Sequence, residues 1–187
     1  MKIFNTDIVG LLIIEPQVFS DERGFFLETF QVQRYREFGI QDIFVQDNHS
    51  YSNARVLRGL HFQVKKPQAQ MVYVSSGTIF DVAVDLRKGS PTFGRWFGTE
   101  LSADNGRQLY MPQGFAHGFC VAGNHADVHY KVTEQYCSGD EGGIAWNDST
   151  LAIKWPIESP FVSERDTLYP CLAEISDSDL PHVEFTD

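Results

Sequence analysis

Short stretches in which apolar and polar residues alternate, separated by glycine and proline, run through the chain and predict β-strands. The clearest stretch is Gly77–Arg87, where apolar residues recur at every second position. Successive side chains of a strand point to opposite faces. Two sets are therefore predicted: Phe80, Val82, Val84 and Leu86 on one face, and Ile79, Asp81, Ala83 and Asp85 on the other. The turn-forming residues of Lys88–Pro91 end this strand.

Similar stretches predict further strands at Leu11–Ile14, Gly24–Phe30, Asp42–Gln46, Val56–Phe62, Met71–Ser75, Trp96–Leu101, Arg107–Met111, Gly118–Ala122 and His125–Val132. One helix is predicted at Val32–Phe38, because Tyr35 and Phe38 share a face. Gly39 then occupies the position of a C-terminal cap. The chain beyond Trp155 is rich in acids, serine and proline, and we expect it to be irregular and to lie over the strands. Many short strands separated by turns are typical of an all-β sandwich or small barrel.

The length and composition indicate one domain spanning residues 1–187. Of the 187 residues, 42% are hydrophobic, which is enough for a packed core. Lys and Arg number 15 against 25 Asp and Glu, and the resulting net charge of −10 argues against a nucleic-acid partner. An anionic ligand can still bind where a few arginines converge in a cleft.

The sequence predicts a cytoplasmic protein without a membrane partner. It contains no stretch near the roughly 18 uninterrupted apolar residues of a membrane span, and its first residues lack the apolar run of a signal peptide. The three cysteines, Cys120, Cys137 and Cys171, are widely spaced and form no CxxC pair. They are interpreted as packing residues or surface thiols in a reducing compartment.

The segment Val56–Gln63 carries two residues suited to chemistry, Arg58 and His61. They are three positions apart, so a regular strand would point them to opposite faces. Gly59 permits a bulge that would turn both side chains toward one cavity. The alternative is a surface arginine and a hydrogen-bonded, half-buried histidine.

The segment Gly106–Phe119 has the spacing Gly-x5-Pro-x-Gly-x2-His, which resembles the second motif of cupin barrels and ends on His117. Val121 replaces the asparagine that completes the motif. Cupins that hold a metal take further ligands from a His-x-His in their first motif, whereas here Phe and Gln follow His61. Because a metal site needs about three protein ligands, we expect no catalytic metal.

Motifs along nearly the whole chain resemble those of the dTDP-4-dehydrorhamnose 3,5-epimerase family. They are Asp21–Glu28, Phe44–Ser50, Val56–Gln63, Phe80–Arg87, Ser90–Gly94, Pro112–Phe119, Tyr130–Thr133, Trp146–Asp148 and Ser163–Asp166. The resemblance implies a cupin-like double-stranded β-helix, or jelly-roll, barrel with short peripheral helices. It also implies an isomerase without cofactors that forms a homodimer by exchanging strands. The ligand would be a nucleotide-linked 4-keto-6-deoxysugar, with dTDP favoured over CDP.

Epimerisation beside a keto group needs a base on one face of the sugar, a donor to the enolate oxygen and an acid on the other face. The resemblance assigns the base to His61, held by Asp166, and the acid to Tyr130. Other positions match ligand contacts in the family: Arg23 and Arg58 for diphosphate and sugar, Glu28, Gln46, Asp47 and Asn48 for nucleotide and sugar, Tyr136 for stacking near the thymine, and His117, Glu141 and Arg165 elsewhere. The strands that carry Arg23 and Glu28 would be exchanged across the dimer.

Gln70 departs from the family pattern, in which a lysine at this position lies near the C4 oxygen of the sugar. A charge-assisted hydrogen bond is worth about 1.5–3 kcal/mol, so its loss would slow the reaction roughly 10- to 100-fold unless Lys65 or Lys66 substitutes. Three alternatives therefore stay open. They are an epimerase for C3 or C5 only with a dTDP- or CDP-linked sugar, a non-catalytic sugar-nucleotide-binding cupin, and a metal-dependent cupin oxygenase or isomerase.

Overall fold

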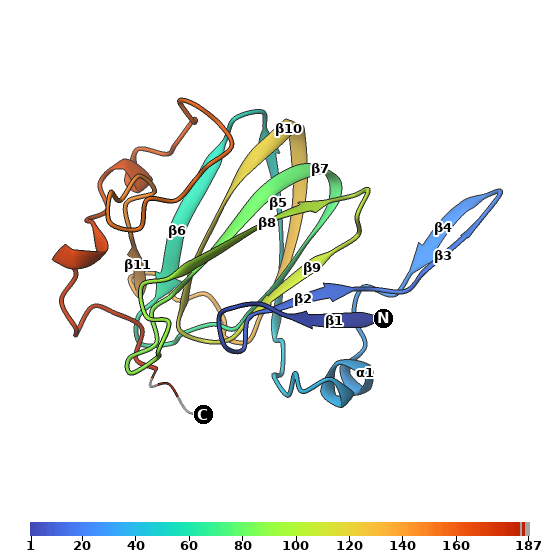
Figure 1. Ribbon diagram of the computed structural model, residues 1–187, viewed down its shortest axis with the longest axis horizontal. Coiled ribbons are helices and arrows are strands. Elements are labelled where there is room, and N and C mark those ends of the chain that lie inside the picture. The colour runs from blue at the N-terminus through green and yellow to red at the C-terminus, as the bar shows by residue number, and fades with distance from the viewer. Residues whose placement is uncertain (184, 186–187) are drawn as a thin grey trace.

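The computed structural model describes residues 1–183 and 185, and Figure 1 shows most of its strands wrapped into one body. The strands are β1 (Lys2–Asn5), β2 (Leu12–Glu15), β3 (Val18–Asp21), β4 (Gly24–Leu27), β5 (Gln46–Asn53), β6 (Leu57–Gln63), β7 (Gln70–Asp85), β8 (Trp96–Ser102), β9 (Gln108–Met111), β10 (Phe115–Val132) and β11 (Glu141–Gly143). The helical elements are α1 (Val32–Glu37) and the 3-10 turns η1 (Arg165–Thr167) and η2 (Leu172–Glu174). The predicted all-β class with short peripheral helices is confirmed. Within the described residues, no helix is long and apolar enough to cross a membrane.

Two long strands, β7 and β10, pair antiparallel along most of their length and join the two halves of the main sheet. The first half of β7 pairs with β9 and its second half with β8, while β10 pairs first with β6 and then with β5. The register shifts where the strands bend. There Gly77 has a φ of +78°, and a Cβ at this residue would lie 1.9 Å from the His125 carbonyl oxygen. Strands that bend in this way let one sheet close over a core.

Several predicted boundaries are wrong. β7 and β10 are single strands, whereas the sequence pattern divided each of them in two at the bend. The segment 42–45 is not a strand, and β4 ends at Leu27 rather than Phe30. The strands β1, β3, β5 and β11 were not predicted. The helix and its cap are confirmed, since α1 is followed by Gly39 with a φ of +94°.

The core is divided by the sheet, and both predicted faces of Gly77–Arg87 are buried. Ile79 and Ala83 belong to the cluster inside the barrel, while Val82 and Val84 belong to a second cluster on the other side of β7. Partly buried residues of the C-terminal chain, Ile153, Trp155, Leu172, Ile175 and Leu180, cover this second cluster. The expectation of an irregular C-terminal segment lying over the strands is therefore confirmed, and Figure 1 shows it running beside β6 and β11.

A buried ion pair closes the end of the barrel where β7 ends. The Arg87 guanidinium donates two hydrogen bonds to Asp85, at 2.9 Å and 2.8 Å, and its backbone amide donates a third at 3.0 Å. The hydroxyls of Ser90 and Thr92 donate to the same carboxylate. Burial alone would raise the pKa of Asp85, but these donors together hold it below its usual value. Lys88 forms a similar pair with Asp177 on the surface, where the two side chains are 69% and 81% exposed.

We expect Asp85→Asn to lower the free energy of unfolding at pH 7 by about 3–5 kcal/mol, because it leaves the buried Arg87 guanidinium unpaired. The matched surface change, Asp177→Asn, should cost less than about 0.5 kcal/mol. Urea unfolding measures both. Because the folded-state pKa of Asp85 is lowered, the advantage of the native chain over Asp85→Asn should shrink as pH falls below about 4. Equal losses in the two variants would contradict this account.

Candidate active site

A cavity of about 720 Å³ opens in the barrel, walled by β5, β6, β7, β10 and β11 and by the segment 161–166. Its volume lies in the range of roughly 300–1,000 Å³ that is typical of small-molecule sites. Most residues predicted for the site line it: His61, Tyr130, Asp166, Gln46, Asn48, Arg58, Gln70, His117, Tyr136, Glu141 and Arg165. Residues that are spread over more than half of the sequence therefore meet in one cavity.

Three predicted residues lie outside this cavity. Asp47 points away from it and accepts a hydrogen bond from Lys131 Nζ at 2.8 Å. Arg23 follows β3 at the tip of the β3–β4 hairpin, and its side chain is 85% exposed. Glu28 follows β4 and pairs with Arg34 at 3.3 Å. Figure 1 shows this hairpin projecting away from the barrel.

A bulge in β6 turns Arg58 and His61 toward the cavity, as the glycine between them predicts. His61 lies opposite His117 on β10 and Arg58 lies opposite Phe119, so β6 has one more residue than β10 in this interval. Gly59 has a φ of +116°, and a Cβ there would lie 2.6 Å from Gly118 Cα. Only glycine fits this conformation and this approach.

His61 is held by the buried carboxylate of Asp166. His61 Nε2 lies 2.7 Å from Asp166 Oδ1, and the Gly59 amide donates to Oδ2 at 3.2 Å. Burial alone would raise the pKa of Asp166, but hydrogen bonds from His61, the Gly59 amide and Ser163 lower it. An ionised acceptor fixes a proton on Nε2 and leaves Nδ1 free to accept one.

A second pair, His117 with Asp81, lies beside the first because His117 and His61 are cross-strand partners. His117 Nε2 lies 2.8 Å from Asp81 Oδ2, and Asp81 is completely buried. The sequence patterns placed Asp81 on one face of its strand but gave it no role. The contact of Asp81 with His117 depends on how β7 pairs with β10, so only that strand pairing could have revealed it.

Tyr130 and Arg58 bring a phenol and a guanidinium to the same cavity. Burial raises the pKa of Tyr130, and the positive charge of Arg58 opposes that shift only in part. Tyr130 therefore keeps its proton at neutral pH and can act as an acid. Arg58 is oriented by Ser52, whose hydroxyl accepts from Nε at 3.0 Å.

The rim of the cavity carries an aromatic ring and a hydrogen-bonded ion pair. Tyr136 is 52% exposed, and its hydroxyl donates to Glu141 Oε2 at 3.1 Å. Arg165 Nη1 donates to the same oxygen at 2.7 Å. An exposed ring beside a guanidinium suits a ligand with a flat base and a phosphate.

Two buried polar atoms in the cavity wall have no hydrogen-bond partner among the described residues, Gln70 Oε1 and Ser50 Oγ. Such atoms are uncommon inside proteins, so they point to groups that a ligand satisfies. The sequence analysis did not identify Ser50. In the first part of β5 every second residue faces the cavity, and Ser50 follows Gln46 and Asn48 in this series. Lys65 and Lys66 are exposed and do not line the cavity, so neither replaces the charge that Gln70 lacks.

The described residues contain no group of three or more His, Cys, Asp or Glu side chains arranged to hold a metal ion. All three cysteines are free, with Cys120 buried and Cys137 and Cys171 partly exposed. The groups that converge on the cavity are instead proton carriers and hydrogen-bond donors. Such groups suit proton transfer on a polar, anionic ligand.

Comparison with known proteins identifies relatives along nearly the whole chain. The family model for dTDP-4-dehydrorhamnose 3,5-epimerase matches residues 5–174. The dTDP-4-dehydrorhamnose 3,5-epimerase of Shigella flexneri is 49% identical over 168 residues, covering 89% of this chain and 93% of that protein.

Two solved structures share the fold. The dTDP-6-deoxy-D-glucose-3,5-epimerase of Legionella pneumophila, in complex with dTDP-4-keto-L-rhamnose, is 48% identical with a TM-score of 0.95, over 100% of this chain and 99% of that chain. The dTDP-4-dehydrorhamnose 3,5-epimerase of Bacillus anthracis, with TDP and PPi bound, is 47% identical with a TM-score of 0.89, over 91% and 99% of the chains. The predicted cupin-like jelly-roll fold is confirmed.

We expect Gly59→Ala to destabilise the protein by about 1–3 kcal/mol, because alanine is strained at this φ and meets the β10 backbone. Gly123→Ala is the matched control within β10, since a Cβ there meets nothing within 4 Å. Urea unfolding measures the loss, and the imidazole NMR signals of His61 and His117 should move only in Gly59→Ala. Unchanged stability and unchanged signals in Gly59→Ala would contradict the close approach of β6 and β10.

Proposed function

The chain belongs to the dTDP-4-dehydrorhamnose 3,5-epimerase family, and from this we propose that it inverts C3 and C5 of a dTDP-linked 4-keto-6-deoxyhexose, with His61 as base and Tyr130 as acid. The observation that carries the proposal is the ionised Asp166 beside His61 in the cavity that Tyr130 also lines. We propose that the chain works as one cytoplasmic domain and needs no metal or cofactor.

The reaction follows from the acidity of hydrogens beside a ketone. His61 Nδ1 removes the proton from C3 or C5, and the electrons of the broken C–H bond pass to the C4 oxygen as an enolate. Tyr130 then donates its proton to the same carbon from the other face, as the enolate electrons return to that carbon and the C4 ketone re-forms. Solvent takes the proton from His61 and returns one to the phenolate, so that both groups are ready for the second carbon. The raised pKa of Tyr130 keeps this proton in place until the enolate forms.

The ligand is bound by the remaining groups of the wall and rim. Tyr136 stacks on the thymine, and Arg58 binds the diphosphate or the sugar. The other proposed contacts to nucleotide and sugar are Gln46, Asn48, Gln70, His117, Glu141 and Arg165. The dTDP-4-keto-L-rhamnose in the Legionella structure and the TDP in the Bacillus structure support a dTDP-linked substrate over a CDP-linked one.

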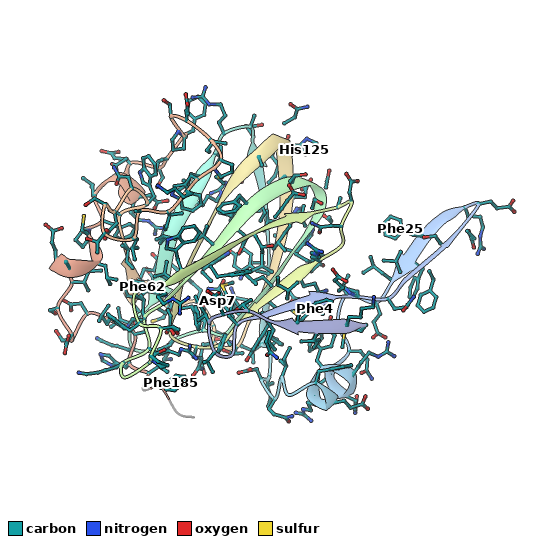
Figure 2. All side chains as sticks on the ribbon, viewed as in Figure 1. Phe4, Asp7, Phe25, Phe62, His125 and Phe185 are labelled. Carbon is teal, nitrogen blue, oxygen red and sulfur yellow. The ribbon has the colours of Figure 1, made fainter. Side chains whose placement is uncertain are left out.

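We propose that a second copy of the chain supplies Arg23 and Glu28. The β3–β4 hairpin pairs with no other strand in the described part of the chain, and Phe19, Phe25 and Phe26 on it are 59%, 67% and 68% exposed. Figure 2 shows Phe25 on the hairpin, apart from the barrel. An isolated two-stranded hairpin is at best marginally stable in water, so an exchanged hairpin packed on a partner accounts for its apolar side chains.

Incubation with dTDP-4-keto-6-deoxyglucose in deuterated water should place deuterium at both C3 and C5, observed by NMR. His61→Asn should lower exchange at both carbons by roughly 10²- to 10⁴-fold, because the base is lost, while dTDP still binds. Tyr130→Phe should retain deuterium exchange at C3 and C5, because His61 still removes both protons. It should lose inversion of the configuration at these carbons, because the acid on the other face is missing. His182→Gln, on the exposed C-terminal segment, is the control and should behave as the native chain.

The outcomes separate the alternative functions. Exchange at a single carbon would make the protein a monoepimerase. Exchange only with the CDP-linked sugar would change the substrate. Binding of dTDP with no exchange on either sugar would make it a non-catalytic sugar-nucleotide-binding protein.

Mixing Arg23→Ala with His61→Asn tests the exchanged hairpin. If Arg23 serves the partner's cavity, each mixed dimer has one intact site, so about one site in four should recover activity after random re-association. Each variant alone should be weak at low substrate concentration. No recovery of activity after mixing, with mixed dimers detected by mass spectrometry, would contradict the exchanged hairpin. Arg23 would then serve the cavity of its own chain or take no part in either cavity.

A further inference from the structure

The two histidine–aspartate pairs of the cavity differ in how the charge of the carboxylate is compensated. His61 and His117 are cross-strand partners, and each binds a buried aspartate through Nε2. Similar geometry would allow similar roles. The surroundings of the two carboxylates are nevertheless unequal, and this inequality assigns different protonation states to the two imidazoles.

Asp166 has several partners besides His61. The Gly59 amide donates to its Oδ2, and Arg165 Nε lies 3.7 Å from its Oδ1. Its negative charge is therefore stabilised without a proton on both nitrogens of His61. A neutral His61 is the state that a base requires.

Within the part of the chain that the structure describes, the Asp81 side chain has only His117 as a hydrogen-bond partner. Its Oδ2 lies 2.8 Å from His117 Nε2, and its Oδ1 has no hydrogen-bond partner among the described residues. No described lysine or arginine forms an ion pair with it. An unpaired carboxylate in a fully buried position is strongly disfavoured, and a protonated His117 is the cation within reach that compensates it.

The groups that face His117 support this assignment. Asp81 faces it from β7 and His61 from β6, and the Phe119 ring lies 6.3 Å from it on its own strand. The other charged or titratable groups of the cavity wall are Arg58, Tyr130, Tyr136, Glu141, Arg165 and Asp166. Two neighbouring imidazolium rings repel each other, so a charged His117 also favours a neutral His61.

We infer that His117, protonated and paired with Asp81, is the cation that stabilises the enolate oxygen, while the neutral His61 removes the proton. In the protonated ring Nδ1 carries a hydrogen and donates to an oxyanion, whereas in the neutral ring bound to Asp81 through Nε2 it would offer a lone pair. Gln70 carries no charge, Arg165 is paired with the Glu141 carboxylate, and Arg58 is the group proposed above for the diphosphate or the sugar. Asp81 is then a positioning residue. This inference rests on the proposed function.

The direct test is the ring ¹⁵N NMR spectrum of the full chain between pH 5 and 9, with His61→Asn and His117→Gln used to assign signals. At pH 8 we expect both nitrogens of His117 to carry protons and His61 to be neutral. In Asp81→Asn, one ring nitrogen of His117 should be without a proton at pH 8. A neutral His117 at pH 7 in the native chain would overturn the inference, whether or not the protein epimerises the sugar.

Kinetics give a second test that a merely structural role of Asp81 would not satisfy. Asp81→Asn should slow deuterium exchange roughly 10- to 100-fold relative to the native chain at pH 8, and less at pH 6, where His117 is protonated without the aspartate. The added change Gln70→Lys should restore part of the rate at pH 8 by returning a positive charge to the cavity. A loss that is the same at both pH values and is not relieved by lysine would overturn the inference.

Asp127→Asn is the matched control, because Asp127 binds His49 at 2.7 Å in an exposed pair on the other face of the sheet. It should leave the rate and the His117 signals unchanged. A native chain that shows a protonated His117 but no exchange would contradict the proposed function and leave the charge assignment intact.

Discussion

The close approach of β6 and β10 at Gly59 and Gly118 determines where the chemistry of this protein can take place. A side chain at either position would collide with the opposite backbone, so the two strands come together only because both residues are glycines. The extra residue in β6 then turns Arg58 and His61 into one cavity. The same bulge aims the Gly59 amide at Asp166. A local backbone constraint thus sets the position of the proposed base, His61, and of the carboxylate that binds it.

Buried carboxylates organise the rest of the molecule, and each is compensated in its own way. Asp85 is paired with Arg87, whereas Asp148 accepts from the backbone amides of Thr150, Leu151 and Leu172. Asp166 combines an imidazole with an amide, and Asp81 has an imidazole alone. Amides and arginine satisfy a carboxylate permanently, while an imidazole can lose its proton. The two carboxylates with structural roles, Asp85 and Asp148, therefore bind arginine or backbone amides. The two carboxylates at the cavity, Asp166 and Asp81, bind an imidazole.

The sequence predicted the fold class and most of the cavity because those features have local signatures. Alternation identified the second half of β7, and the glycine in β6 predicted its bulge. β5 was missed because its inward residues, Gln46, Asn48 and Ser50, face a polar cavity and give no hydrophobic period. The bends of β7 and β10 interrupt the alternation, so each strand was divided. The pairing of Asp81 with His117 depends on strand register, which a single sequence does not specify.

The amide at position 70 changes which strand carries the charge in the cavity. A lysine there would place a cation on β7, two positions along from Val72, the cross-strand partner of Tyr130. With Gln70 in its place, the wall of β7 offers a neutral donor and an unpartnered oxygen, which suit a hydroxyl group rather than an oxyanion. Positive charge next to the proposed base then depends on β10, where His117 is held by a carboxylate that has no other partner among the described residues. In the proposed reaction, stabilisation of the enolate is therefore coupled to the protonation of an imidazole, whereas a lysine ammonium would keep its charge over a wider range of pH.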